Sequence, residues 1–327
     1  KHLQVMISEK PKIVYLDQKC WINLAKLYYT NKTKNESDLL KKILDASEKN
    51  RIIFPLSLSH INETNRISSK KRRNQLAFLM SKISKAYTIQ PYVDKIIRAE
   101  IRNIVLRKHD LKPKDIREYV LKKGISNLLG AKPTLVPRKG NKNSKLPDSV
   151  KKELLDLLET PEAIQLALNQ RPPTSEWLNK KALVTKLEKI RTELSNIKDN
   201  NLRQRVFLAQ NITAIVAPEL AKATIQFNLP KDFFLKLKPT RKDIEDLLDD
   251  IPTARCFLTL IYHRDSQLQR PIQTNDFNDI WFLTLAIPYS DIVVTERMWV
   301  SIATRAKLDK KYDTELLSSI QQLEQYL

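Results

Sequence analysis

Four acidic residues that lie far apart in the chain each stand at the edge of an apolar segment. Asp17 and Glu296 directly follow short apolar runs that are typical of buried strands. Glu63 lies early in a helical pattern that follows such a run, and Asp279 directly precedes an apolar helical pattern. Because ligands of open α/β sheets bind beyond the carboxyl ends of the strands, these carboxylates are expected to meet at one edge of a sheet.

Carboxylates gathered in this way could hold one or two divalent metal ions. Oxygen-only ligands favour Mg²⁺ or Mn²⁺ over zinc. Such an ion polarises a phosphodiester, lowers the pKa of a bound water and shields the leaving oxygen. The four histidines show no spacing typical of metal ligands, and His60 is expected to be structural although it lies near Glu63 in sequence. The pattern therefore predicts a magnesium or manganese site that cleaves phosphodiester bonds.

Asp276 joins the set because it lies three residues before Asp279. If the helix already begins at Asp276, both side chains project from one face. If it begins later, both lie at its N-terminus, where the helix dipole stabilises negative charge. Capping alone explains one carboxylate, but two carboxylates with Asn275 beside them exceed what capping requires. We therefore include Asp276 among the catalytic and metal-binding candidates and Asn275 among the substrate-binding ones.

Asp291 and Glu296 bracket one predicted strand, so they compete for the same role. Five residues of extended chain separate them by about 16 Å. Only one of them can share a site with Asp17, and if the two strands run parallel that one is Glu296. Asp291 is then expected to lie at the start of the strand, and it remains the lower-ranked candidate for the metal site.

Basic residues flank the acidic candidates and could hold substrate phosphates. The run Lys70, Lys71, Arg72 and Arg73 follows Glu63, and Arg297 directly follows Glu296. Contacts of this kind strengthen binding to a nucleic-acid backbone without reading its sequence. The alternative for the run is a solvated loop that interrupts the surrounding helical pattern.

Composition favours a polyanionic partner. The chain has 327 residues, and its 58 Lys and Arg outnumber its 37 Asp and Glu, which gives a formal net charge of +21. Nucleic acid fits this charge better than the alternative of lysine-rich solvated helices. Only 3 Gly are present, and the glycine motifs of nucleotide-binding loops are absent.

Other features of the sequence point to a cytoplasmic protein. Cys20 and Cys256 lack ligand spacing and lie near apolar segments, so they are expected to be reduced core residues. No run of 18 apolar residues predicts a membrane span. Residues 1–12 lack the apolar region of a signal peptide.

Apolar runs and helical periodicity predict an α/β fold that is split in sequence. Strands are expected at 12–17, 52–54 and 291–295, with helices between them, which favours a parallel sheet. A short strand at 311–312 and a final helix over 313–326 complete this domain, which comprises 1–90 plus 251–327.

Residues 91–250 show helical patterns almost throughout and predict an all-helical insertion that binds substrate, a protein partner or a second copy of the chain. A polar loop is expected over 130–148, and a break in the long helix 201–228 is expected near Pro218.

Both ends of the chain resemble the PIN and PIN-like nuclease family. The resemblance covers about half of the length and rests on four segments: Ile-Val-Tyr-Leu-Asp17, Phe-Pro-Leu-Ser-Leu-Ser-His-Ile-Asn-Glu63, Asn-Asp276-Phe-Asn-Asp279 and Asp291-Ile-Val-Val-Thr-Glu296. In that family an acid ends the first strand, a Glu lies in an early helix, an Asp opens a later helix, and an acid follows a "Val-Thr" strand. The resemblance thus implies a three-layer PIN-like fold with these roles at Asp17, Glu63, Asp279 and Glu296.

The chain departs from the family pattern in two places. The usual last acid is an Asp two places after the Thr, whereas here Glu296 follows Thr295 directly and Arg297 takes the usual place. This leaves Asp276 or Asp291 as substitutes. The insertion is also much longer than a minimal PIN domain needs.

The resemblance implies metal-dependent cleavage of a phosphodiester, most often in RNA, by a protein that in prokaryotes is commonly a toxin or part of a defence system. The alternatives are a DNA-cutting nuclease of the same fold and a non-catalytic nucleic-acid-binding or scaffold protein with a decayed PIN fold.

Overall fold

The computed structural model describes residues 10–30, 34–131, 147–170, 180–236 and 239–327. Its centre is a four-stranded parallel sheet in the order β2-β1-β5-β6. The strands are β1 (Lys12–Leu16), β2 (Ile52–Ile53), β5 (Ile292–Val294) and β6 (Glu315–Leu317). The predicted α/β class and parallel sheet are therefore confirmed, and the two ends of the chain meet in the middle of the sheet.

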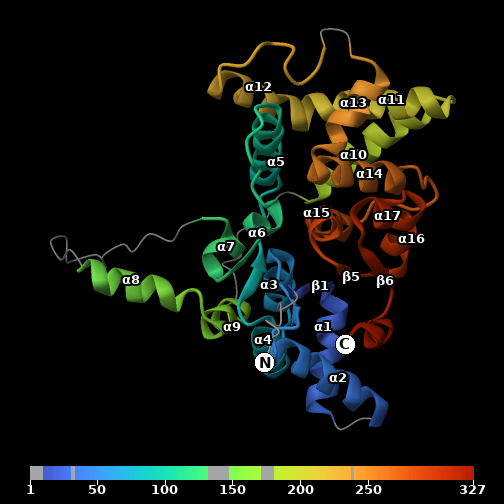
Figure 1. Ribbon diagram of the computed structural model, residues 1–327. Coiled ribbons are helices and arrows are strands. Elements are labelled where there is room, and N and C mark those ends of the chain that lie inside the picture. The colour runs from blue at the N-terminus through green and yellow to red at the C-terminus, as the bar shows by residue number, and fades with distance from the viewer. Residues whose placement is uncertain (1–9, 31–33, 132–146, 171–179, 237–238) are drawn as a thin grey trace, which may run out of the picture.

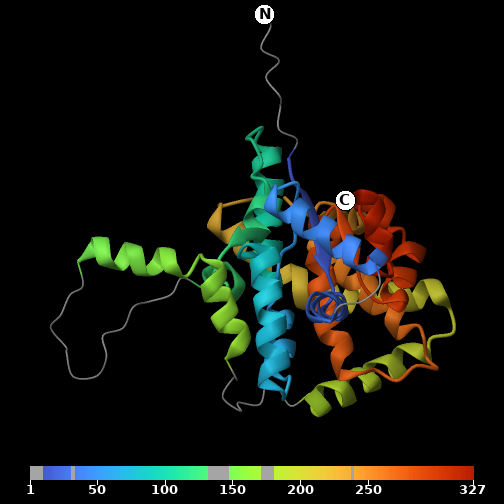
Figure 2. The same cartoon turned by 90° about the horizontal axis from the view of Figure 1, so that it is seen from below.

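Helices cover both faces of this sheet, which gives three layers (Figures 1 and 2). Successive side chains of a strand point to opposite faces. Accordingly, Val14 and Leu16 belong to one buried apolar core, and Tyr15 lies in the other. The neighbouring strand divides in the same way, with Ile292 and Val294 in the first core and Val293 in the second. Burial on both faces explains why these strands read as continuous apolar runs.

The N-terminal part of the chain forms most of the layer on the first core. Its helices are α1 (Gln18–Tyr29), α2 (Lys34–Glu48), α3 (Leu58–Asn65) and α4 (Lys70–Ser84). Ser57 and His60 form a capping box at the start of α3, which fixes where that helix begins. The alternative of a solvated loop over Lys70–Arg73 is wrong, because Ser69 caps α4 and the run forms the first turn of that helix.

The C-terminal part lies mainly on the other face of the sheet. Its helices are α14 (Pro252–Asp265), α15 (Thr274–Tyr289), α16 (Arg297–Arg305), α17 (Leu308–Tyr312) and the 3-10 helix η2 (Ile320–Tyr326). The strand predicted at 311–312 is wrong, because these residues end α17. The final helix predicted over 313–326 is also wrong in its first part, because β6 forms there by pairing with the free edge of β5.

The stretch 91–250 is mostly helical in its described parts but not entirely so. Its helices are α5 (Val93–Lys108), α6 (Ile116–Val120), α7 (Ile125–Leu129), α8 (Asp148–Leu157), α9 (Pro161–Asn169), α10 (Lys180–Ser195), α11 (Asn200–Asn211), η1 (Ile212–Val216), α12 (Ala217–Gln226) and α13 (Arg241–Asp249). The prediction of an all-helical insertion is wrong at β4 (Leu121–Lys123), which pairs antiparallel with β3 (Tyr87–Ile89). Most of the loop predicted over 130–148 lies outside the described residues.

The predicted break near Pro218 takes the form of a widened turn. Helix α11 continues into α12 through η1, a single π-helical stretch. Pro218 follows it in the first turn of α12, where its missing N–H costs least. The proline thus explains why the hydrogen-bond ladder widens just before it.

The insertion shares the two cores of the sheet domain. Residues of α5, α11 and α12 pack in the same core as α14, α15 and α16, and residues of α9 pack in the core of α1 and α4. By contrast, α8 has no buried residue and projects from the body of the molecule in both views (Figures 1 and 2). None of the described helices is long and apolar enough to cross a membrane.

Candidate metal centre

The sheet register brings Asp17 and Glu296 to the same edge. Leu16 of β1 lies opposite Val294 of β5, so the residues that follow both strands leave the sheet together. The backbone N–H of Asp17 donates to the carbonyl of Val294 at 2.9 Å. The Thr295 hydroxyl donates to Oδ2 of Asp17 at 3.3 Å. Because the strands are parallel, Glu296 shares this edge with Asp17.

Glu63 is brought to the same edge by a buried contact between α1 and α3. Nε2 of Gln18 donates to the Thr64 hydroxyl at 3.1 Å. Gln18 directly follows Asp17, and Thr64 directly follows Glu63. The hydrogen bond therefore ties the start of α1 to the segment that carries Glu63.

Asp279 reaches the site from the second turn of α15. Its Oδ2 accepts a hydrogen bond of 3.1 Å from Nε1 of Trp299. Trp299 is fully buried in α16, three residues after Glu296. The contact therefore fixes the Asp279 carboxylate against the helix that Glu296 caps.

The raised pKa values of Asp279 and Asp17 reflect the other carboxylates at this edge. Burial together with the negative charges of Asp17, Glu63 and Glu296 raises the pKa of Asp279 to about 7, although the hydrogen bond from Trp299 opposes the shift. Burial likewise raises the pKa of Asp17, and the charge of Glu296 adds to the effect. We call Asp17, Glu63, Asp279 and Glu296 the acidic site.

An open cavity of about 420 Å³ adjoins the acidic site. Asp17 and Glu296 line it on the acidic side, and Lys19 and Arg297 supply positive charge. The remaining wall comes from α1, α16 and the segment after β6, with Cys20, Asn23, Thr295, Met298, Ser318, Ser319, Ile320 and Gln321. The cavity gives a polyanion access to two of the four carboxylates.

The chemistry of the donor set suits a divalent cation. Neighbouring negative charges raise the pKa of Asp279 and of Asp17, and a cation bound among them would remove that repulsion. As the side chains lie, however, the described residues include no group of three or more His, Cys, Asp or Glu side chains placed to hold a metal ion. Binding would therefore require these side chains to move closer together.

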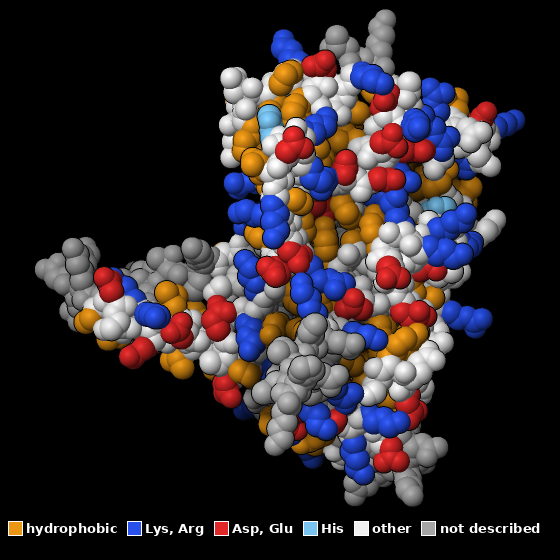
Figure 3. All heavy atoms as spheres, in the orientation of Figure 1, with side chains coloured by type: hydrophobic (Ala, Val, Ile, Leu, Met, Phe, Trp, Pro, Cys, Tyr) orange, Lys and Arg blue, Asp and Glu red, His pale blue; other side chains and the backbone are white. Residues whose placement is uncertain are grey.

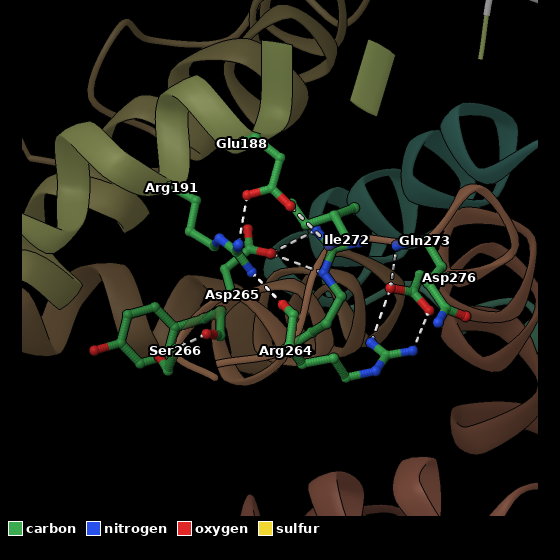
Figure 4. A network of polar contacts seen from close by, with 10 residues as sticks. Glu188, Arg191, Arg264, Asp265, Ser266, Ile272, Gln273 and Asp276 are labelled. Carbon is green, nitrogen blue, oxygen red and sulfur yellow. Dashed lines mark hydrogen bonds and ion pairs between the residues drawn. The ribbon is translucent and has the colours of Figure 1, made fainter. Parts of the chain in front are cut away.

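Asp276 forms an ion pair and caps a helix, so its assignment to the metal site is corrected. Both of its oxygens pair with the guanidinium of Arg270, at 2.7 and 2.9 Å (Figure 4). It also accepts the backbone N–H of Gln273 at 3.0 Å, as part of a capping box at the start of α15. The side chain is 2% exposed. Ion pairing and capping thus occupy the carboxylate that the sequence suggested for a metal.

Helix α10 of the insertion holds the loop that leads into α15 (Figure 4). Glu188 accepts the backbone N–H of Ile272 at 2.7 Å, and Arg191 donates to the carbonyl of Arg270 at 2.6 Å. Glu188 and Arg191 also form an ion pair with each other. The insertion therefore fixes the N-terminus of the helix that carries Asp279.

Asp291 lies at the opposite edge of the sheet, as its position before the strand predicts. It accepts the backbone N–H of Ile13 at 2.6 Å and forms an ion pair of 3.0 Å with Arg117 of α6. Asp291 therefore closes the start of β5 and cannot substitute for Glu296.

The predicted phosphate-binding residues differ in exposure, and one of them is buried. Lys70, Lys71 and Arg72 are exposed on the first turn of α4. Arg73 is 6% exposed and donates to the carbonyl of Ile67 at 2.7 Å, so its assignment as a phosphate contact is wrong. Arg297 and Asn275 are both exposed, at the starts of α16 and α15.

Three residues of the site were not identified from the sequence. Thr295 and Trp299 donate to the carboxylates of Asp17 and Asp279, and Gln18 links α1 to α3. Thr295 could have been identified from the sequence, because it ends the "Val-Thr" strand. The roles of Trp299 and Gln18 depend on contacts between elements far apart in sequence, which carry no local signal.

His60 has the structural role predicted for it. It is fully buried, stacks on the Tyr15 ring at 5.4 Å between centroids, and accepts the Ser57 backbone N–H at 2.9 Å. Burial lowers its pKa to about 3, so the ring is neutral. Its contacts join the start of α3 to β1.

Comparison of the chain with models of protein families, with curated proteins and with solved structures finds no match in any of the three.

Proposed function

We propose that this protein is a divalent-metal-dependent endoribonuclease with a PIN-like fold. One observation carries the proposal: Asp17, Glu63, Asp279 and Glu296 come from four different elements, and their charges still act together on the pKa of Asp279. A structural role does not require four acids to meet at the carboxyl edge of a parallel sheet. Perturbed pKa values of this kind are common at catalytic sites.

The fold supports the PIN-like assignment without establishing it. The sheet is parallel, its first strand ends at Asp17, and helix α15 carries Asp279. Glu63 lies in an early helix, and Glu296 follows the "Val-Thr" strand. These are the positions that the resemblance assigns to the family's acids.

Each residue of the site has a distinct part in the proposed chemistry. A bound Mg²⁺ or Mn²⁺ would polarise the scissile phosphate and lower the pKa of an attacking water. Trp299 orients the Asp279 carboxylate, and Thr295 orients that of Asp17. Lys19 and Arg297 lie beside the same cavity, where they would hold phosphates next to the scissile bond.

The test is cleavage of single-stranded RNA with and without Mn²⁺. The wild type should produce defined cut ends, and EDTA should abolish them. Asp17→Asn and Asp279→Asn should each lower the rate by about 100-fold or more. Asp313→Asn is the matched control, since it changes an acid that precedes β6 at the opposite edge of the same sheet, and it should keep the activity.

Undiminished cleavage by the Asp17→Asn and Asp279→Asn proteins would refute the proposed site. The same assay with single-stranded DNA of equal sequence distinguishes a ribonuclease from a DNA-cutting enzyme.

A non-catalytic nucleic-acid-binding protein with a decayed PIN fold is the second candidate. Two observations favour it: the described residues offer no ready group of three metal ligands, and Arg297 stands where the family usually has its last acid. This candidate predicts salt-sensitive RNA binding without turnover in Mg²⁺ or Mn²⁺.

A further inference from the structure

A second and larger cavity, of about 1020 Å³, lies between α5, α6 and α12 of the insertion. Eight of its lining residues are Lys or Arg and two are acidic. The basic residues are Lys10, Lys95, Arg98, Arg102, Lys112, Lys114, Lys122 and Lys222. We call this cavity the basic cavity. Figure 3 shows Lys and Arg side chains grouped over α5 and α6, on the left of the upper half.

Much of this positive charge is not balanced within the protein. Arg98 and Lys222 share the buried carboxylate of Glu219, at 2.7 and 2.6 Å. Among the residues that the structure describes, Arg102, Lys112 and Lys114 have no ion-pair partner, and all three are exposed. Like charges confined in one concavity repel one another and attract a polyanion.

Two aromatic rings lie among these charges. Tyr119 and Phe227 line the basic cavity, and both are half-buried. The Lys122 ammonium lies 5.2 Å from the centre of the Tyr119 ring. Positive charge interleaved with aromatic rings is the arrangement by which proteins hold single-stranded nucleic acid, since phosphates pair with the cations and bases stack on the rings.

The basic cavity lies at the opposite edge of the sheet from the acidic site. Lys10 precedes β1, whereas Asp17 follows it. Helix α6, which lines the cavity, is fastened to the start of β5 by the Arg117–Asp291 ion pair. The five residues of β1 separate the two edges by about 16 Å. The basic cavity is therefore a separate site and is not the wall of the metal centre.

We propose that the basic cavity binds a segment of single-stranded RNA and anchors the substrate away from the acidic site. The proposal rests on the proposed function and deepens it, because it places substrate capture in the insertion and cleavage at the sheet. Binding there is carried by phosphates and stacked bases, so it tolerates many sequences and weakens steeply with salt.

The experiment measures fluorescence anisotropy of a labelled single-stranded RNA of about 12 nucleotides in EDTA, so that binding is read without cleavage. The triple variant Arg102→Glu, Lys112→Glu, Lys114→Glu should bind about 30-fold or more weakly than wild type. The slope of log affinity against log salt should fall by about 2, since each phosphate contact on a single strand contributes about 0.7.

The matched control replaces with Glu three exposed lysines that do not line the basic cavity: Lys26, Lys152 and Lys242. It changes the net charge by the same amount and should alter affinity by less than about threefold. Equal losses in the two triple variants would show that only net charge matters and would overturn the proposal.

A substitution of Tyr119→Ala gives a second reading that does not change charge, and it should weaken binding by about 5-fold or more through lost stacking. Competition by ATP as effective as that by RNA at equal phosphate concentration would overturn RNA as the occupant. Because all of these measurements are made without metal, failure of the nuclease assay leaves their outcome readable.

Discussion

Asp279 shows how a single carboxyl can serve a site at the expense of the fold. It is largely buried beside three other acids, and its stabilising contact is the hydrogen bond from Trp299. An ionised carboxylate loses hydration in such a place and gains repulsion from its neighbours. A carboxylate that costs stability in this way is what the proposed metal site would require.

Asp279→Asn should therefore stabilise the metal-free protein at neutral pH. The folded-state pKa is about 7, above the ordinary value of 3.8, so the folded protein holds this proton more tightly than the unfolded chain does. Its contribution to stability is present below about pH 4 and is lost as pH rises toward 7. Urea unfolding in EDTA should show the variant about 2–4 kcal/mol more stable at pH 7.

The same comparison at pH 4 should show little gain, because both proteins then carry a neutral side chain. Asp291→Asn, which loses an ion pair with Arg117, should show no gain at either pH. A loss of stability for Asp279→Asn at pH 7 would mean that the carboxylate is compensated in the fold.

At the start of α15, an aspartate three positions before Asp279 has a structural role. Asp276 caps the helix and pairs with Arg270, whereas Asp279, one turn on, belongs to the acidic site. The two positions were indistinguishable by residue type alone. The spacing of Gln273 and Asp276 is that of a capping box, and it was the available signal for the structural role.

Asp276→Ala should destabilise the protein by about 3 kcal/mol, because it removes a cap and leaves Arg270 without its partner. Thermal unfolding measures the effect. The matched control is Asp243→Ala, which removes the equivalent capping-box residue of α13, where the ion-pair partner Lys236 is exposed, and it should cost less. An equal or larger loss in the control would show that the Arg270 pair adds nothing.

Elements marked by an apolar run or by helical periodicity were predictable from the sequence, and short strands without such a pattern were not. Helix α5 lies in the stretch where helical periodicity predicts helices, and β1 follows from its apolar run. The strands β4 and β6 have three residues each, too few to show a period of two. They form because a neighbouring strand offers a free edge, β3 in one case and β5 in the other. Local sequence cannot report such a partner.

At the scale of the whole molecule, Glu100 joins the insertion to the sheet domain. This buried residue of α5 accepts hydrogen bonds from the backbone and hydroxyl of Thr253, at 3.0 and 2.6 Å, and from the Tyr289 hydroxyl. Cys256 and Tyr312 are the other titratable groups that its charge affects. Burial raises the pKa of Glu100 to about 7, although these hydrogen bonds oppose the shift.

Glu100→Gln should flatten the pH dependence of stability. Because the folded-state pKa lies above the ordinary value of 4.5, the protonated acid stabilises the fold below about pH 4.5 and this contribution is lost by pH 7. The loss amounts to about 3 kcal/mol for wild type, and the amide cannot titrate. Urea unfolding at a series of pH values gives the comparison.

Glu219→Gln is the control, because the pKa of Glu219 is shifted in the opposite direction from that of Glu100. The Arg98 and Lys222 pairs lower the pKa of Glu219, so its contribution is lost only as pH falls below the ordinary range of a glutamate. If the free energy of unfolding of Glu100→Gln falls as steeply as that of wild type between pH 4.5 and 7, groups other than Glu100 cause the pH dependence.

The order of the sheet also has a consequence for how the chain is made. Strand β1 lies between β2 and β5, and β5 begins only at Ile292. A ribosome adding about 5–20 residues per second therefore leaves one side of β1 without its neighbour for tens of seconds. An apolar strand with an open edge invites pairing with other nascent chains. During synthesis, pairing of β1 with β5 therefore competes with aggregation of nascent chains through β1. Slower translation of residues 91–250 should lower the soluble yield.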